Sequence, residues 1–299
     1  MSFLVVGSVA YDSVKTPFGK KDEALGGSAT YCALAASFFT PVNLVAVVGK
    51  DFSKKDINLF KKRNIDTKGL KIKNGKTFRW KAEYSYNLNN RKTLSTDLNV
   101  LKNFNPELPP AYKNSEYVFL ANLDPDVQLK VLNQLNNTKL IASDTMNLWI
   151  KKKKKSLLKL LNYVEIFIIN DSEAKDLTQE SNLIKAGRII STMGPKMVIL
   201  KKGEHGALFL GKDFRFCSAA YPLESIYDPT GSGDVFAGGF MGYLAKKNKL
   251  TVPNFKKAVI YGSILASFNV ESFSVERIKS LSLKDINKRY KELKKLTHF

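Results

Sequence analysis

The stretch Tyr227–Phe240, YDPTGSGDVFAGGF, joins a glycine-rich loop to a helical pattern that begins near a single carboxylate, Asp234. Gly231 and Gly233 give the loop the freedom to turn successive backbone N–H groups toward one point. The residues after Asp234 have helical periodicity, so these N–H groups lie at a helix N-terminus. Unpaired donors and the helix dipole make such an end a binding site for an anion, typically phosphate.

Asp234 needs a separate explanation, because a bound phosphate repels a neighbouring carboxylate. One interpretation is that it accepts the proton of an attacking hydroxyl, as the catalytic Asp of a kinase does. The other is an acid in the first helical turn that the dipole alone favours. The full string, with Gly238, Gly239 and Phe240 on the helix, favours the first interpretation. The two glycines also predict a helix that packs close to a sheet.

The rest of the chain predicts an α/β fold. Short apolar runs such as Phe3–Ser8 and Val42–Gly49 alternate with amphipathic stretches. Strands that are apolar on both faces indicate a mostly parallel sheet covered by helices on both sides. We expect Ser28 to cap a helix over 28–39, Asp51 or Ser53 to cap the next helix, and the lysine-rich run 150–161 to form one surface helix.

The segment from Leu70 to Val100 breaks this rhythm. Its NG and NN turns separate stretches in which polar and apolar residues alternate. That pattern is typical of antiparallel hairpins with one solvated face. We interpret the segment as a small β-flap on the α/β body.

The composition is that of an ordinary folded protein with a large positive charge. Its 48 basic and 27 acidic residues give a net charge of +21. Such a charge suggests binding to nucleic acid or a membrane surface. A/T-rich codons are a sufficient alternative cause, because lysine far outnumbers the arginine that base-reading proteins use. We therefore expect no nucleic-acid or membrane partner.

The expected location is the cytoplasm. The apolar start, MSFLVVGSVAYDSV, has no basic region or cleavage site and is too short to span a bilayer, so it predicts a strand. Cys32 and Cys217 are expected to be free thiols.

The string DPTGSGDVFAGGF closely resembles the C-terminal signature of the ribokinase-like (PfkB-type) carbohydrate kinases, D-T-x-G-x-G-D-x-F-x-G-G. Four further segments resemble elements of this family in its order along the chain. They are GSVAYD with Asp12, LGGSATYCALAAS with Gly26 and Gly27, INDSEA with Asn170 and Glu173, and LKKGEHGAL around Gly203 and Gly206. The resemblance covers essentially the whole chain.

The resemblance implies a single ribokinase-like domain over 1–299, a three-layer αβα sandwich with a mostly parallel sheet. A lid formed by roughly 10–25 and 70–100 closes the site and mediates a homodimer. The implied reaction transfers the γ-phosphate of ATP to a hydroxyl of a sugar or sugar-like molecule.

The resemblance also assigns roles to residues. Asp234 is the general base, with the backbone N–H groups of Gly231, Ser232 and Gly233 around the transferring phosphoryl group. The remaining implied sites are the acceptor site (Asp12, Gly26, Gly27, Tyr31), the nucleotide site (Asn170, Glu173, Lys201, Gly203, Gly206, Asn269), Mg²⁺ held through water by Glu173 and Asn170, and a monovalent cation near Asp228.

Four features depart from the family pattern. Pro229 replaces the usual Thr after Asp228, and Lys201 stands where many members have a Thr, to pair with a phosphate or to be solvated. Tyr31 stands where the second signature commonly has a sugar-contacting Asn. The flap carries Phe78, Trp80, Tyr84 and Tyr86, which either pack in the flap or a dimer or stack on a nucleobase. A nucleoside is thus the alternative acceptor, and a non-catalytic nucleotide-binding protein a further alternative.

Overall fold

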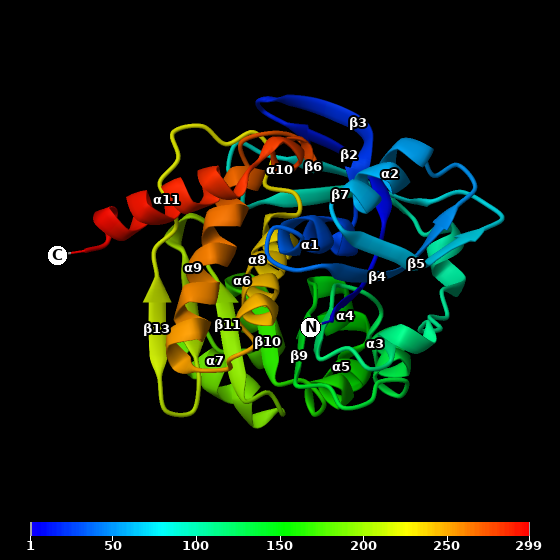
Figure 1. Ribbon diagram of the computed structural model, residues 1–299. Helices are drawn as coiled ribbons and strands as arrows, with labels where there is room; N and C mark the ends of the chain where they lie inside the picture. The colour runs from blue at the N-terminus through cyan, green and yellow to red at the C-terminus, as the bar shows by residue number, and fades with distance from the viewer. Residues whose placement is uncertain (1, 299) are drawn as a thin grey trace.

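The core of the molecule is a nine-stranded sheet, seen in a computed structural model that describes residues 2–298 (Figure 1). The strand order is β13-β12-β11-β10-β9-β8-β1-β4-β5. All neighbouring pairs are parallel except β11–β12 and β12–β13, which are antiparallel. The strands are β1 (Phe3–Val6), β4 (Val42–Gly49), β5 (Ile65–Lys73), β8 (Tyr117–Leu120), β9 (Leu140–Asp144), β10 (Ile166–Asn170), β11 (Met197–Lys201), β12 (Ala207–Leu210) and β13 (Arg215–Ser218).

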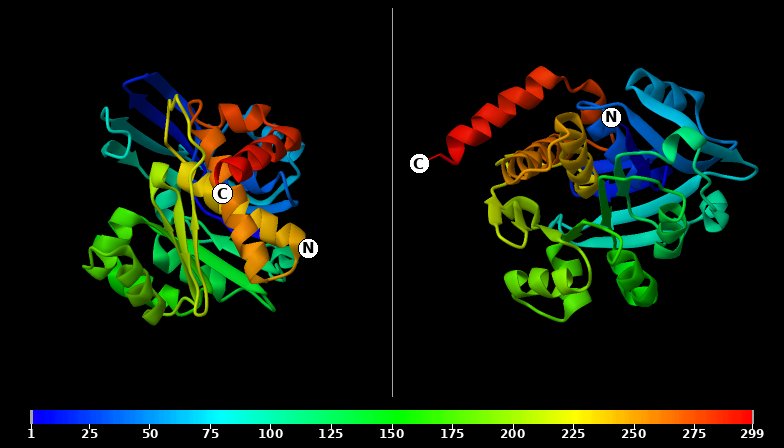
Figure 2. Two further views of the ribbon diagram at one scale, coloured as in Figure 1. Left: turned by 90° about the vertical axis from the view of Figure 1, so that its left-hand side faces the viewer. Right: turned by 60° about the horizontal axis from the view of Figure 1, so that its bottom comes forward.

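Helices cover both faces of this sheet, which confirms the predicted layering (Figure 2). Successive residues of β1 alternate between the two cores: Phe3 and Val5 face one, Leu4 and Val6 the other. One layer contains α1 (Ser28–Ala36), α2 (Lys54–Lys62), α8 (Ser232–Lys247), α9 (Val252–Asn269), α10 (Glu276–Ser280) and α11 (Leu283–Leu296). The other contains α3 (Pro125–Leu132), α4 (Asn147–Lys152), α5 (Lys154–Leu161), α6 (Asp171–Thr178) and α7 (Leu183–Thr192).

Two local predictions were wrong and one is confirmed. Ser53 caps α2, as expected, by accepting the N–H of Lys55. Ser28 is the first residue of α1 rather than its cap; the cap is Gly27, and the Ser28 hydroxyl instead bonds to the β1–β2 turn at Ser8. The basic run 150–161 is not one helix, because the chain breaks at Lys153 between α4 and α5.

Helix α8 lies on the sheet, with Phe240 packed against Phe209 of β12, but its glycines face neighbouring helices, so the role predicted for the glycines was wrong. A Cβ at Gly238 would lie 2.2 Å from the carbonyl oxygen of Cys32 on α1. A Cβ at Gly239 would lie 3.0 Å from Cα of Gly262 on α9. The glycines therefore let α8 lie against the backbones of both neighbours.

A second sheet of four strands lies over one end of the main sheet (Figure 1). Its order is β3-β2-β6-β7, with β2 and β6 parallel and the other pairs antiparallel. Its strands are β2 (Ala10–Thr16), β3 (Gly19–Gly26), β6 (Phe78–Tyr84) and β7 (Arg91–Asp97). The first residues of the expected flap, Leu70–Lys73, belong to β5 of the main sheet instead.

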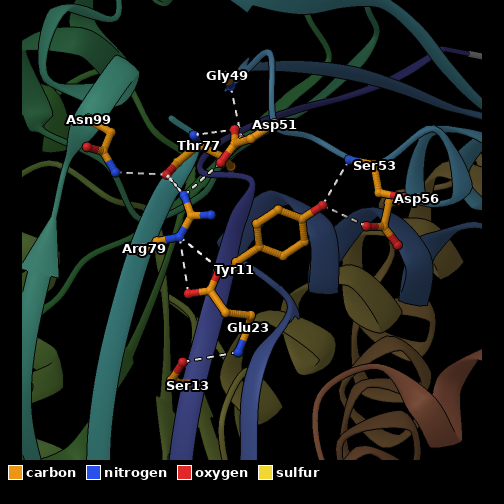
Figure 3. Close-up of polar contacts among 10 residues, drawn as sticks. All are labelled: Tyr11, Ser13, Glu23, Gly49, Asp51, Ser53, Asp56, Thr77, Arg79 and Asn99. Carbon is orange, nitrogen blue, oxygen red and sulfur yellow. Dashed lines mark hydrogen bonds and ion pairs between the residues drawn. The ribbon is translucent and has the colours of Figure 1, made fainter. Parts of the chain in front are cut away.

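A polar network fastens the second sheet to the body beside α2 (Figure 3). Arg79 on β6 pairs with Glu23 on β3 at 2.8 Å and with Asp51, which follows β4, at 2.8 Å. The hydroxyl of Tyr11 on β2 accepts the N–H of Ser53 and donates to Asp56 at the start of α2. The end of the second sheet at which β2 and β6 begin is thus fixed by charge-assisted hydrogen bonds.

Both cysteines are free thiols, as expected. Within residues 2–298, no helix is both long and apolar enough to cross a membrane.

The packing of α8 on α1 predicts that Gly238→Ala lowers the free energy of unfolding by about 1–3 kcal/mol, because the added methyl group meets backbone that must shift. Gly187→Ala on α7 is the matched control. Its Cβ would meet the flexible end of Leu210, 2.3 Å away, which can rotate. Urea denaturation of both variants measures the effect, and equal midpoints would contradict the close-packing explanation.

Candidate active site

Polar side chains gather at the carboxyl ends of three adjacent parallel strands. Asp144 ends β9, Asn170 ends β10 and Lys201 ends β11. Lys201 lies directly opposite Asn170 in the register, and Asp144 lies opposite Ile168. The crevice at the carboxyl ends of the strands is where open α/β sheets bind ligands.

The N-terminus of α8 lies beside this edge. Its cap, Gly231, has φ 73°, a left-handed conformation suited to glycine, and a Cβ there would lie 2.4 Å from the ring of Tyr31. The N–H of Ser232 already donates to the carbonyl of Pro229 at 3.2 Å. Of the three N–H groups expected to surround a phosphoryl group, that of Ser232 is therefore engaged in a turn.

Asp234 lies in the first turn of α8 and is partly exposed, as a group that meets a substrate must be. Burial among its neighbours raises the pKa of its carboxyl to about 6. The charges of Lys201 and Arg91 oppose this rise, and that of Glu173 adds to it. A carboxyl group with such a pKa is ionised at neutral pH and is a stronger base than an ordinary Asp.

Asp12 belongs to the second sheet and closes the other side of the site. It is 6% exposed, and Gly26 makes room for it, because a Cβ at Gly26 would lie 2.0 Å from its Oδ2. Burial raises the pKa of Asp12 to about 7, partly offset by the backbone N–H of Gly27 and increased by Asp228 and Asp234. The structure thus brings Asp12 and Asp234 within each other's electrostatic field.

Asn170 and Glu173 form a capping box at the start of α6. Asn170 Oδ1 accepts the N–H of Glu173 at 2.8 Å, and Glu173 Oε2 accepts the N–H of Asn170 at 3.0 Å. This satisfies two unpaired donors of the helix. It uses one oxygen of each side chain, so a structural role for the pair is established and a role toward metal stays a prediction.

Asp144 is a candidate residue that the motifs did not single out. It is 4% exposed, and its Oδ1 is buried with no hydrogen-bond partner among the described residues. Burial raises its pKa well above the usual range. The charges of Asp234 and Glu173 add to this rise, and the charge of Lys201 opposes it. The signal for Asp144 in the sequence is an acidic residue at the end of a short apolar run.

Lys201 lies among the carboxyl groups rather than in solvent. Its charge lowers the pKa values of Asp144, Glu173 and Asp234, all of which burial raises. A Cβ at Gly233 would lie 2.6 Å from Nζ of Lys201, so the ammonium group touches the start of α8. Within residues 2–298, Lys201 forms no ion pair shorter than 4.0 Å.

Two residues of the second sheet, Tyr84 and Arg91, also lie near the site. No sequence motif predicted this role for them. The Tyr84 hydroxyl lies 3.2 Å from the hydroxyl of Thr230. Arg91, opposite Tyr84 in the register, contributes a positive charge at Asp12, Glu173 and Asp234. Their roles depend on tertiary contacts with the loop before α8.

The remaining predicted residues lie around this centre. Asn269 is fully buried and donates to the carbonyl of Thr230 at 2.8 Å, so it supports the loop before α8. Gly203 and Gly206 flank a turn after β11 with φ values of 55° and 79°. Asp228 accepts the N–H groups of Thr230 and Ser274.

Tyr31 is 2% exposed, and its hydroxyl has no partner in the described part of the chain. Burial raises its pKa, with contributions from Asp12, Asp228 and Asp234, so the phenol keeps its proton. It lines a narrow gap, too small for a water molecule, together with Asp12, Val14, Lys21, Ala24, Asp228 and Ser274. A protonated, unpaired hydroxyl at this place could donate to a bound molecule once the gap opens.

Comparison with known proteins gives a consistent result. A profile described as pfkB family carbohydrate kinase matches residues 5–280. A cytidine kinase of Thermococcus kodakarensis is 29% identical over 249 residues, which are 81% of this chain and 88% of that protein.

Two solved structures show the fold. The nucleoside kinase of Methanocaldococcus jannaschii, an archaeal member of the ribokinase family, has a TM-score of 0.78 at 20% identity, covering 97% of this chain and 98% of that one. An E. coli putative Ribokinase II in complex with ATP and Mg²⁺ has a TM-score of 0.80 at 16% identity, covering 97% and 99%. The predicted ribokinase-like fold is confirmed.

The raised pKa of Asp234 predicts a pH-dependent gain in stability for Asp234→Asn. At pH 8 the folded protein holds a charge that the unfolded chain would solvate, and this cost disappears below about pH 4, where the carboxyl is protonated in both states. The melting temperature of the variant should exceed that of the wild type at pH 8 and converge with it near pH 4.

Asp285→Asn is the control with the opposite sign. Hydrogen bonds from Ser282 hold the pKa of Asp285 below its usual range, so its contribution to stability is present at neutral pH and lost in acid. This variant should melt lower than wild type at pH 8. A lower melting temperature for Asp234→Asn at pH 8 would contradict the assignment of Asp234 as a poorly solvated charge.

Proposed function

We propose that this chain, which belongs to the pfkB family of carbohydrate kinases and is a phosphotransferase acting on hydroxyl groups, transfers the γ-phosphate of ATP to a hydroxyl of a nucleoside. The observation that carries the proposal is that Asp12, from the second sheet, and Tyr31 line one narrow gap, while Tyr31 also contacts Gly231, the cap of the helix that carries Asp234. One carboxylate can hold an acceptor hydroxyl group and the other can take a proton from it.

In this mechanism Asp234 accepts the proton of the acceptor hydroxyl as its oxygen attacks the γ-phosphorus of ATP. The new oxygen–phosphorus bond forms while the bond from the γ-phosphorus to the β,γ-bridging oxygen breaks. ADP leaves with the bonding electrons. The proton stays on Asp234 until solvent removes it.

Charge on the phosphoryl group is balanced by the protein. The N–H groups of Gly231 and Gly233 at the start of α8 would donate to it, and the Lys201 ammonium lies beside Gly233. Donors that are held in place before the reaction stabilise developing charge at little reorganisation cost. Gly203 and Gly206 would border the nucleotide, as the family resemblance implies.

The acidic residues fit the Mg²⁺ that accompanies ATP. Glu173 and Asp144 offer hard oxygen ligands, including the unpaired Oδ1 of Asp144. Within residues 2–298, no three acidic, His or Cys side chains stand close enough to hold a metal alone, so Glu173 would act with Asn170 through water and phosphate oxygens. When bound, Mg²⁺ would neutralise charge on the phosphates.

A nucleoside is preferred to a simple sugar for two reasons. The similar proteins above are named as a cytidine kinase and a nucleoside kinase. Trp80 lies opposite Asp12 in the register of β2 and β6 and is only partly buried, so a base could stack on it. A simple sugar offers Asp12 the same hydroxyl groups but no flat ring for Trp80, and it is the second candidate.

Three further expectations belong to the proposal. The strands β2, β3, β6 and β7 would act as a lid over the site and form the contact of a homodimer, which light scattering would test. Both oxygens of Asp228, near which a monovalent cation is expected, already accept N–H groups, so a cation would use their second lone pairs. A catalytically inactive nucleotide-binding protein would have no use for Asp234 as a base.

Purified protein with ATP, Mg²⁺ and a panel of nucleosides and sugars should release ADP fastest with a nucleoside. Asp234→Asn should lower kcat by at least about 100-fold, because general-base catalysis is removed. Asp285→Asn should leave kcat unchanged. Full activity of Asp234→Asn would overturn the assigned base, and a preference for simple sugars would overturn the assigned acceptor.

Tyr31→Phe should raise the KM for the nucleoside about threefold to tenfold, the worth of one neutral hydrogen bond. It should not destabilise the protein without substrate, because the hydroxyl is unpaired there. Tyr112→Phe is the matched control, since its hydroxyl donates to the carbonyl of Asp66 at 3.1 Å. That variant should lose stability and keep its KM; an unchanged KM for Tyr31→Phe would remove Tyr31 from the acceptor site.

A further inference from the structure

The two central strands of the second sheet run from its fixed end to the loop that leads into α8. Strands β2 and β6 are parallel, and both begin at the end held by Tyr11 and Arg79 (Figure 3). They end at Thr16 and Tyr84. Thr16 is 5% exposed and Tyr84 is 7% exposed, although each is the last residue of its strand. Another part of the chain therefore covers both strand ends.

The loop that leads into α8 makes a hydrogen bond with each of these strand ends. The hydroxyl of Thr16 donates to the carbonyl oxygen of Tyr227 at 2.9 Å. The hydroxyl of Thr230 donates to the hydroxyl of Tyr84 at 3.2 Å. The ring of Phe18, in the turn after β2, lies edge-on to the ring of Tyr227, with the centroids 6.4 Å apart. The second sheet thus holds the loop near both of its ends.

The main body holds the same loop through other groups. The N–H of Tyr227 donates to the carbonyl of Val270 at 2.8 Å, and Nδ2 of Asn269 donates to the carbonyl of Thr230 at 2.8 Å. The carbonyl of Tyr227 and the side chain of Thr230 are bonded to the second sheet instead. The hydrogen bonds that shape the loop are therefore divided between the two sheets.

The loop orients an N–H group that the proposed mechanism uses. Gly231, the cap of α8, follows Thr230, and its N–H lies in the same planar peptide unit as the carbonyl of Thr230. The contacts that hold Thr230 therefore also orient the N–H of Gly231. A misplacement of about 1 Å at a group that meets the transition state can lower a rate about 100-fold.

Strand β2 also carries the residue that faces the acceptor. Asp12 and Thr16 are both buried and lie four residues apart on the same face of β2. At about 3.3 Å per residue, they are separated by about 13 Å of a single strand. A position of β2 that brings Asp12 onto an acceptor thus also brings Thr16 onto the loop.

We propose that Thr16 and Tyr84 are positioning residues, whose hydroxyl groups complete the phosphoryl-binding loop when the lid closes on an acceptor. The inference rests on the proposed kinase function and adds a link between the acceptor half and the phosphate half of the site. With the lid open, the loop lacks two hydrogen bonds, and the N–H of Gly231 is held less firmly. Transfer is therefore fast only when an acceptor keeps the lid closed.

The kinetic test uses Tyr84→Phe, Thr230→Val and Thr16→Val. Each removes one hydroxyl group and should lower kcat about threefold to tenfold, the worth of one neutral hydrogen bond. The KM for the nucleoside should stay within about twofold of the wild type. The double variant of Tyr84→Phe and Thr230→Val should be no slower than either single variant, because both remove the same bond. Thr16→Ser keeps the hydroxyl and should keep most of the wild-type kcat.

Tyr112→Phe is the matched control, because it also removes the hydroxyl of a buried, hydrogen-bonded tyrosine. This variant and Tyr84→Phe should lose similar amounts of stability in urea denaturation. Tyr112→Phe should nevertheless keep the kcat of the wild type. Equal losses of kcat in the two variants would show that Tyr84 acts through stability alone, and would overturn its role in positioning the loop.

A second readout does not depend on turnover. In calorimetry with Mg²⁺, cytidine, or a faster acceptor if the panel finds one, should tighten the binding of the non-hydrolysable ATP analogue AMP-PNP to the wild type. The closed lid completes the loop that meets the γ-phosphate, and such coupling between two ligands is reciprocal. Tyr84→Phe should lose most of this gain. ADP has no γ-phosphate, so its affinity should be the same in both proteins.

Two further outcomes would overturn the proposal for Thr16 and Tyr84. One is a kcat within about twofold of the wild type for Tyr84→Phe and Thr16→Val, together with an intact gain in AMP-PNP affinity. The other is a rise in the KM for the nucleoside alone, which would place the two hydroxyl groups on the acceptor. If the wild type transfers phosphate to no acceptor, the proposed function fails instead, so the two failures are distinguishable.

Discussion

The contact between α8 and α1 sets the geometry on which the site depends. Gly238 lies directly against the backbone of α1, so no side chain separates the two helices there. The same contact brings the N-terminal cap of α8, Gly231, onto the ring of Tyr31. Asp234, in the first turn of α8, is therefore held at a fixed distance from the strand ends that carry Asp144 and Lys201. A shift of α8 by the width of a methyl group would displace Asp234, the proposed general base, relative to every other group of the site.

The site concentrates negative charge that the protein does not neutralise by itself. Burial is the chief cause of the raised pKa values of five carboxyl groups, those of Asp12, Asp144, Glu173, Asp228 and Asp234. The positive charges that lower pKa values within this group are those of Lys201 and Arg91. Buried charges without partners destabilise a fold, and such stored strain is typical of active sites. Under the proposed function, the arrangement would become favourable when cations arrive with the nucleotide, which would couple the stability of the protein to substrate binding.

The sequence predicted those parts of the site that local patterns encode. The glycine-rich signature gave the helix start around Asp234, and the alternation of apolar runs gave the parallel sheet and its two helical layers. Ser28 was misjudged because a serine next to the true cap, Gly27, looks in the sequence like an N-cap residue. The run 150–161 was misjudged because one non-helical residue, Lys153, does not change the helical spacing of its leucines. The meeting of Asp144, Lys201 and Arg91 could not be predicted, since it depends on strand register and on how the second sheet lies over the first. The packing partners of the α8 glycines were wrong for the same reason.

The strand that carries Asp12 belongs to the second sheet, whereas Asp234, Glu173 and Lys201 belong to the main body. In the proposed mechanism, the group that would hold the acceptor and the group that would take its proton are thus built on separate supports, joined through Arg79 and Tyr11. Neither support alone forms a complete reaction centre. Under the proposed function, a water molecule that reached the nucleotide while the two supports were apart would find the base but no opposite wall to orient it. The division of the site between two sheets would then itself be a safeguard against wasteful hydrolysis of ATP.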